Sequence, residues 1–241
     1  MLEFIPAATL KKSFDVFGHF YSVNLVSGIR IECRSVLEIV RKEKEHANLN
    51  LLPAQAPDAI FIMMNPGSSK PSEEVENIIS ERDISQLSIS LVPTKPDTTQ
   101  YQLMRVMHYC KWSHVRVLNI SDLRDPKSGN FVDRYRVIEK ETGYTAHSLF
   151  DDKRNNEFKM KIIKKKLAPV ICAWGVSTNL DTLITKCTNK ISGTYRLTGL
   201  LKPNTLNKYF HPLPTLQTEK IKWVDDIVKR IKADQLNLRR K

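Results

Sequence analysis

Three short apolar runs predict strands that are buried on both faces. They cover residues 59–64, 115–120 and 169–174, and each ends at polar or turn-forming residues. A continuous apolar run of this length is typical of a strand in a parallel sheet that helices cover on both sides. A shorter run at residues 194–198 predicts a fourth strand.

Segments with helical periodicity lie between and after these runs. Apolar residues at helical spacing, preceded by capping threonines in three of the four cases, predict helices over 98–110, 157–167, 178–187 and 218–231. Strands that alternate with helices predict a parallel sheet with helices on both faces. We therefore expect an α/β fold, a three-layer α/β/α sandwich around a central, mainly parallel, four-stranded sheet.

The other segments are predicted to surround this sheet. Residues 14–34 are rich in aromatic and β-branched residues around a Ser-Gly turn, which predicts a β-hairpin at an edge or side of the sheet. Residues 36–48 are predicted to form a charged helix. Residues 70–96 are polar, contain three prolines and are interpreted as an insertion with one short helix. A long loop is expected after residue 120.

These segments are interpreted as one domain that spans residues 1–241. The hairpin and the helix that follows it form an N-terminal extension over residues 1–55. A chain of this length buries enough apolar surface to fold without a metal or disulfide.

Charge is distributed unevenly along the chain. The formal net charge is +12; residues 1–120 hold 13 basic and 13 acidic side chains, whereas residues 121–241 hold 25 basic and 13 acidic. An excess of positive charge confined to one half indicates a polyanionic partner, most simply nucleic acid. Solvated, lysine-rich helix faces explain the same excess, so charge alone leaves both interpretations open.

The cysteines indicate neither a disulfide framework nor a metal site. The four, Cys33, Cys110, Cys172 and Cys187, include no C-x-x-C pair and show no zinc or iron–sulfur spacing. We expect free thiols in a reducing compartment, with no cofactor and no metal. No apolar run approaches the ~20 residues that a membrane span needs, and the first residues lack signal-peptide features. We expect a cytoplasmic monomer that does not contact membranes.

Polar and aromatic residues follow the ends of the predicted strands. Asn65, Asn119 and Trp174 stand at strand ends, and His211 lies in the loop after the fourth strand. Ligands of open α/β sheets bind beyond the carboxyl ends of the strands, so we expect these four residues to converge on one rim. Taken singly, each has a structural explanation, as when Asn65-Pro66-Gly67 is a type II turn.

The order and spacing of these residues resemble the uracil-DNA glycosylase superfamily. Met64-Asn65-Pro66-Gly67 resembles the Asn-Pro-Gly loop of the mismatch-specific and thymine-DNA branch, which positions the attacking water. Leu118-Asn119 is similar to a Leu-Leu-Asn strand end whose asparagine reads the base edge. Ala173-Trp174-Gly175 is similar to a Leu-Trp-Gly strand end, and His211-Pro212-Leu213-Pro214 to a His-Pro-x-Pro loop whose histidine stabilises the departing base.

The resemblance covers roughly residues 59–230 and implies a strand order of 2-1-3-4. It implies a DNA glycosylase that extrudes uracil or another modified base and hydrolyses its N-glycosidic bond, with basic residues of 121–241 contacting duplex or single-stranded DNA. Asn65 and His211 are the implied catalytic residues. The implied base-contacting residues are Met64, Pro66, Gly67, Ser68, Asn119, Trp174, Pro212 and Leu213.

A second similarity and three departures keep other functions open. The chain also resembles bacterial and phage domains of unassigned function that share Met-Asn-Pro, Ala-Trp-Gly and His-Pro-Leu. Thr215 stands where the superfamily has a duplex-wedging leucine, which Leu213 or Leu216 would have to replace, and the amide of Asn65 orients water but accepts no proton. The insertion at 70–96 directly follows the Asn-Pro-Gly loop, where it would be in a position to reshape or cover the site. The alternatives are a non-catalytic nucleic-acid-binding protein and an enzyme on a small nucleotide, in repair or in phage–host conflict.

Overall fold

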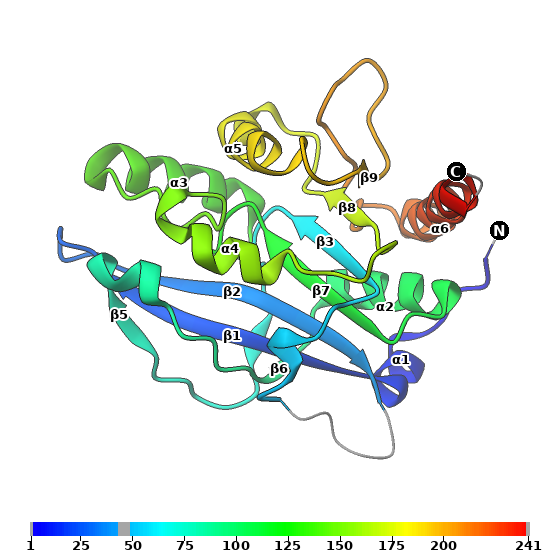
Figure 1. Ribbon diagram of the computed structural model, residues 1–241, viewed down its shortest axis with the longest axis horizontal. Coiled ribbons are helices and arrows are strands. Elements are labelled where there is room, and N and C mark those ends of the chain that lie inside the picture. Colours follow the sequence, from blue (N-terminus) through cyan, green and yellow to red (C-terminus); the bar gives the residue numbers. More distant parts are fainter. Residues whose placement is uncertain (1, 43–48, 240–241) are drawn as a thin grey trace.

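The computed structural model describes residues 2–42 and 49–239, whose strands form one mixed sheet flanked by helices (Figure 1). The strands are β1 (Phe14–Asn24), β2 (Arg30–Arg41), β3 (Ala59–Met63), β4 (Lys70–Pro71), β5 (Ile78–Ser80), β6 (Val92–Lys95), β7 (His114–Asn119), β8 (Val170–Ala173) and β9 (Leu197–Thr198). The α-helices are α1 (Ala7–Ser13), α2 (Thr98–Cys110), α3 (Ser128–Thr142), α4 (Asn155–Lys161), α5 (Asp181–Ile191) and α6 (Gln217–Arg239). Short 3-10 helices are η1 (Leu52–Ala54), η2 (Glu81–Gln86), η3 (Asp152–Arg154) and η4 (Thr178–Leu180).

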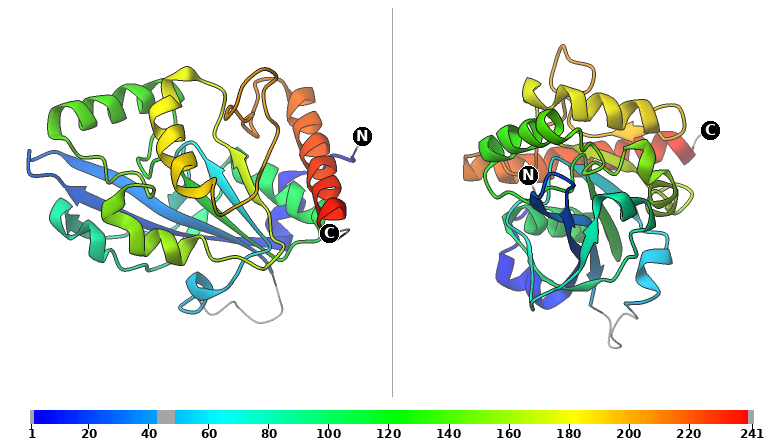
Figure 2. Two further views of the ribbon diagram at one scale, coloured as in Figure 1. Left: turned by 45° about the horizontal axis from the view of Figure 1, so that its top comes forward. Right: turned by 90° about the vertical axis from the view of Figure 1, so that its left-hand side faces the viewer.

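The parallel part of the sheet contains β7, β3, β8 and β9, in this spatial order. Every residue of β3, β7 and β8 is buried, as their apolar sequences predict. Alternate side chains enter two cores. Phe61 and Met63 belong to the core that includes residues of α1, α2 and α6, whereas Ile60 and Ile62 belong to the core of α3, α4 and α5. Helices therefore cover both faces of the sheet (Figure 2).

The sheet as a whole is mixed and nine-stranded within the described residues. The α/β class is confirmed, but the prediction of a mainly parallel, four-stranded sheet is wrong. Antiparallel pairing of β2 with β7 joins the N-terminal hairpin to the parallel strands. Residues 33–40 of β2 are all buried, so this strand packs on both of its faces and continues the sheet.

The predicted helix over residues 36–48 is a strand as far as Arg41, and residues 43–48 lie outside the described residues. Glu38 lies within this strand, and its side chain is buried. Its carboxylate accepts a hydrogen bond from Nε of Arg116 at 2.6 Å and contacts Nε2 of His114 at 2.8 Å. A partner on β7 thus permits a charged residue inside the sheet.

Residues 70–96 pack along the outer strand of the hairpin. β6 pairs antiparallel with β1, β4 pairs with β6, and β5 pairs parallel with β1. These short strands cover backbone that an edge strand would leave unpaired. The 3-10 helix η2 is the short helix expected in this segment.

Two further features concern the helices. The loop predicted after residue 120 contains α3, whose buried residues Phe131, Tyr135 and Ile138 recur at helical spacing. Among the described residues, none of the helices combines the length and the apolar character needed to cross a membrane.

Candidate functional site

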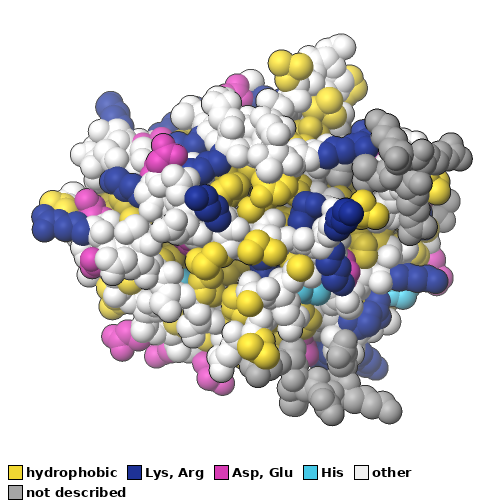
Figure 3. Space-filling model, viewed as in Figure 1, with side chains coloured by type: hydrophobic (Ala, Val, Ile, Leu, Met, Phe, Trp, Pro, Cys, Tyr) yellow, Lys and Arg dark blue, Asp and Glu magenta, His cyan; other side chains and the backbone are white. Residues whose placement is uncertain are grey.

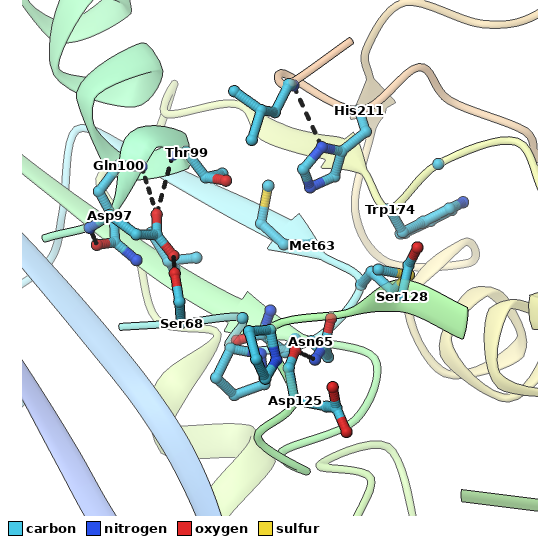
Figure 4. A pocket seen from close by; sticks show the side chains of 18 of the residues that line it. Met63, Asn65, Ser68, Asp97, Thr99, Gln100, Asp125, Ser128, Trp174 and His211 are labelled. Atoms are coloured by element: carbon cyan, nitrogen blue, oxygen red, sulfur yellow. Dashed lines mark hydrogen bonds between the residues drawn. The ribbon is translucent and has the colours of Figure 1, made fainter. Parts of the chain in front are cut away.

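A pocket of about 480 Å³ opens at the carboxyl ends of the parallel strands (Figure 4). Its floor includes Met63 at the end of β3, Val117 and Asn119 of β7, and Trp174 directly after β8. The first residues of α2 and the start of α3 complete the wall. The position is the one that ligands take in open α/β sheets.

Nine of the ten residues expected from the sequence line this pocket. They are Met64, Asn65, Pro66, Gly67, Ser68, Asn119, Trp174, His211 and Leu213. Pro212 is the exception, and its carbonyl oxygen accepts a hydrogen bond from Nε2 of Gln102 at 2.9 Å. Pro212 therefore anchors the histidine loop to α2. No lining residue comes from 70–96, so the insertion does not plug the pocket.

Asn65 fixes the loop that follows β3. Its amide nitrogen Nδ2 donates to the carbonyl oxygens of Leu123 at 3.3 Å and Asp125 at 2.8 Å. Gly67 has φ +66°, a conformation that other residues adopt with strain. Because Nδ2 is committed to the backbone, Oδ1 is the atom of Asn65 that remains able to accept a hydrogen bond from water.

His211 is a neutral hydrogen-bond donor in this pocket. Burial lowers its pKa to about 4, so the ring carries no charge near neutral pH. The backbone N–H of Leu213 donates to its Nδ1 at 3.2 Å. A ring nitrogen that accepts this bond carries no proton, which places the proton of the neutral ring on Nε2. Figure 4 shows the ring directed toward Met63, across the pocket from Asp97 and Ser68.

Asn119 is buried, and its amide has one fixed orientation. Oδ1 accepts a hydrogen bond from Nη2 of Arg34 at 3.1 Å. Arginine only donates, so the oxygen must face Arg34 and Nδ2 must face the other way. Nδ2 is buried and has no partner among the described residues. Asn119 therefore offers a donor alone to a base edge, although a free amide presents both a donor and an acceptor.

Arg34 and Asp97 line the pocket and were not predicted from the sequence. Arg34 comes from β2; the sequence signal was an arginine within a largely apolar strand. Asp97 caps α2, because its Oδ1 accepts from the backbone N–H groups of Thr99 and Gln100 at 2.9 and 3.2 Å. Its Oδ2 lies 3.4 Å from the hydroxyl of Ser68. The Asp97–Gln100 capping box was the available signal.

Trp174 is a structural wall of the pocket. Its side chain is fully buried, and its Nε1 donates to the carbonyl oxygen of Asn207 at 2.8 Å. The ring also meets Tyr209 edge-on, with centroids 5.5 Å apart. These contacts order the loop that leads to His211.

The donor set of the pocket suits an organic ligand that presents oxygen acceptors. Within the described part of the chain, no group of three histidine, cysteine, aspartate or glutamate residues is arranged to hold a metal ion. Comparison of the chain with protein-family models, with curated proteins and with solved structures finds no match in any of the three. Function is therefore argued from the chemistry of this pocket.

Proposed function

We propose that the protein is a DNA glycosylase that hydrolyses the N-glycosidic bond of uracil or another modified base. The observation that carries the proposal is the neutral His211, whose Nε2–H enters the same pocket as the Asn65 loop. Cleavage leaves the electron pair of the bond on the departing base, whose oxygen then becomes negative. A fixed N–H donor aimed at that oxygen stabilises the transition state more than the ground state.

The remaining groups take complementary roles in this proposal. Oδ1 of Asn65 holds the water that attacks the sugar, and Asp97 supplies a carboxylate in the same pocket as a proton acceptor. Asn119 lies at the floor as a donor toward a base oxygen. Met63, Leu103 and Val117 add apolar surface against which a base can pack.

The order of the parallel strands within the mixed sheet also supports the proposal. These strands pair in the order β7-β3-β8-β9, which is the 2-1-3-4 order that the resemblance to uracil-DNA glycosylases implies. Asn65, Asn119, Trp174 and His211 all line the pocket at the carboxyl ends of these strands.

An enzyme on a small nucleotide is the second candidate. Among the described residues, no lysine or arginine after residue 120 lines the pocket. Figure 3 shows lysine and arginine side chains spread over the visible face without one continuous patch. A glycosylase must therefore contact phosphates from the rim, whereas a small substrate needs no such contacts.

Incubation with base-modified substrates tests the proposal. Single- and double-stranded oligonucleotides with uracil, hydroxymethyluracil, hypoxanthine or xanthine are presented beside the corresponding free nucleotides, and released bases are identified by mass spectrometry. We expect release of at least one base from an oligonucleotide, with an alkali-labile abasic site left behind. Release from free nucleotides alone favours the second candidate, and no release from any substrate overturns the glycosylase.

A further inference from the structure

Arg34 reaches the pocket through a bulge in the N-terminal hairpin. Phe20 pairs with Arg34 and His19 pairs with Val36, so Ser35 is an extra residue in β2. A bulge of this kind rotates the neighbouring side chains and is frequent beside functional sites. Here the hairpin contributes one buried arginine to a pocket otherwise built by the parallel strands and their loops.

The guanidinium of Arg34 joins two parts of the pocket. Nη2 donates to Oδ1 of Asn119 at the end of β7, and Nη1 lies 3.4 Å from the carbonyl oxygen of Pro66 in the Asn-Pro-Gly loop. Both acceptors are neutral. Nε is buried without a partner, and Arg34 forms no ion pair with any carboxylate in the described parts of the chain.

The charge of Arg34 is thus buried and lacks a direct counter-ion. Burial lowers the pKa of Arg34 to about 10, against the attraction of Asp97 and Asp122, so the side chain stays protonated at neutral pH. A buried charge without a paired carboxylate is unfavourable for folding. The unpartnered Nδ2 of Asn119 and the unpartnered Nε of Arg34 lie in the same cluster.

We infer that Arg34 is the positive charge that stabilises the departing base as that base becomes anionic. The inference rests on the proposed glycosylase activity. When the N-glycosidic bond breaks, both bonding electrons go to the base, water adds to the sugar carbon, and the proton of that water leaves to a carboxylate or to solvent. The base anion later takes a proton from water, so the overall reaction is hydrolysis.

Two physical effects link Arg34 to the base. A fixed charge in a dry, low-dielectric site acts on a nearby anion without reorganisation. The hydrogen bond from Arg34 also draws electron density from the amide of Asn119, which makes its Nδ2–H groups stronger donors. Arg34 is thus a positioning residue for Asn119 and the source of positive potential at the pocket floor.

A leaving-group series distinguishes this role from a structural one. Single-turnover release of uracil is compared with release of 5-fluorouracil, a more acidic and therefore more stable leaving group, in matched duplexes. For Arg34→Gln, which removes the charge, we expect a loss of ~10²-fold with uracil and a clearly smaller loss with 5-fluorouracil. Arg34→Lys keeps the charge, and its rate ratio for the two bases stays near that of the wild type.

Relative rates within one variant are independent of the fraction that is folded. Asn119→Asp neutralises the charge of Arg34 in a second way, because the new carboxylate pairs with the guanidinium. We expect the same selective loss of rate with uracil. If the wild type is active but Arg34→Gln and Asn119→Asp each lose the same factor with both bases, the inference is overturned and the proposed function is not. A wild type that releases neither these bases nor any base of the panel overturns the proposed function itself.

Discussion

Two regions of this molecule bury positive charge in opposite ways. Beneath α4, the cluster of Asp122, Arg154, Glu157 and Lys161 gives each cation a carboxylate: Arg154 contacts Asp122 and Glu157 at 2.7 Å each, and Lys161 is also hydrogen-bonded to Glu157. At the pocket, Arg34 contacts only neutral oxygens. Arg34 and Arg154 are both buried, so burial itself does not explain why one has carboxylate partners and the other has none.

The contrast separates charge that serves the fold from charge that serves a ligand. Burial alone would raise the pKa of Glu157, but Lys161 and Arg154 outweigh it and hold that pKa at about 2. Each cation of the α4 cluster therefore has a carboxylate partner, and the cluster atom without a hydrogen-bond partner among the described residues is an acceptor, Oδ1 of Asp122. The pocket floor instead has two donors without a partner, Nε of Arg34 and Nδ2 of Asn119, and in our proposal an acceptor on the base completes it.

Breaking the α4 cluster should have the largest effect on stability. Glu157→Gln leaves Arg154 and Lys161 short of a buried counter-ion, and we expect the free energy of unfolding to fall by about 3–5 kcal/mol. Urea denaturation at pH 7 measures this. Asp226→Asn is the matched control, because its pair with Lys222 has the same i,i+4 spacing but is exposed, and we expect a change of at most about 0.5 kcal/mol. Equal effects of the two substitutions would remove the contrast between the regions.

A substitution in the pocket should have the opposite effect, because activity should be lost while stability is kept. His211→Ala removes the Nε2–H donor, and the rate of base release should fall by about 10²–10³-fold. Thermal melting followed by circular dichroism checks that the fold survives. His108→Ala, at an exposed position of α2, is the control and should leave the rate unchanged. Wild-type rates in His211→Ala would show that this pocket is not where the base departs.

The pH dependence of stability sharpens the assignment of a neutral His211. Its folded pKa of about 4 lies below the unfolded value of about 6.5, so the unfolded chain binds the proton first. Stability from this group is complete above pH 6.5 and falls as the pH drops toward 4. Between pH 6 and pH 5, wild type should lose about 1 kcal/mol more than His211→Asn. Parallel pH profiles for the two proteins would contradict the neutral assignment.

The smallest effect concerns phosphate contacts at the rim. Lys127 is exposed and lies between the lining residues Pro126 and Ser128. In fluorescence-polarisation titrations of duplex DNA, Lys127→Ala should reduce the slope of log affinity against log salt by about 1. Lys12 is the control. It precedes β1, whose first residues lie at the amino-terminal end of β7, at the opposite end of that strand from the pocket. A Lys12→Ala variant with the same reduced slope would show that binding is not localised to the rim.

The sequence predicted the parallel strands and the pocket lining better than it predicted the hairpin. Ile60 and Val170 belong to apolar runs, and burial of these runs could be predicted from local sequence alone. The Asn-Pro-Gly and Trp-Gly motifs directly follow those strands, so their place at the pocket could be predicted too. Arg34 enters the pocket only because β2 pairs with β7 and bulges at Ser35. That pairing joins residues about 80 positions apart, and neither periodicity nor spacing reveals it.

The two wrong assignments near the hairpin and after β7 have different origins. The charged stretch over residues 36–48 suggested a helix, whereas Glu38 within it is buried against Arg116, a residue distant in sequence. In α3 the helical spacing of Phe131, Tyr135 and Ile138 was present in the sequence, but the Ser-Gly at its start suggested a loop. The first structure depends on a tertiary contact, whereas the second follows from a periodicity that the sequence itself contains.

Thermal melting of Asn119→Asp tests the unpaired charge of Arg34 most directly. The substitution places a carboxylate where Arg34 now contacts an amide, and it replaces the unpartnered Nδ2 with a second acceptor. We predict a melting temperature at least about 2 °C above wild type, as expected for roughly 1 kcal/mol in a chain of this size, with base release reduced. Asn119→Leu should melt below wild type. An Asn119→Asp protein that melts as low as Asn119→Leu would contradict the account, because Arg34 would then have no unmet need for a counter-ion.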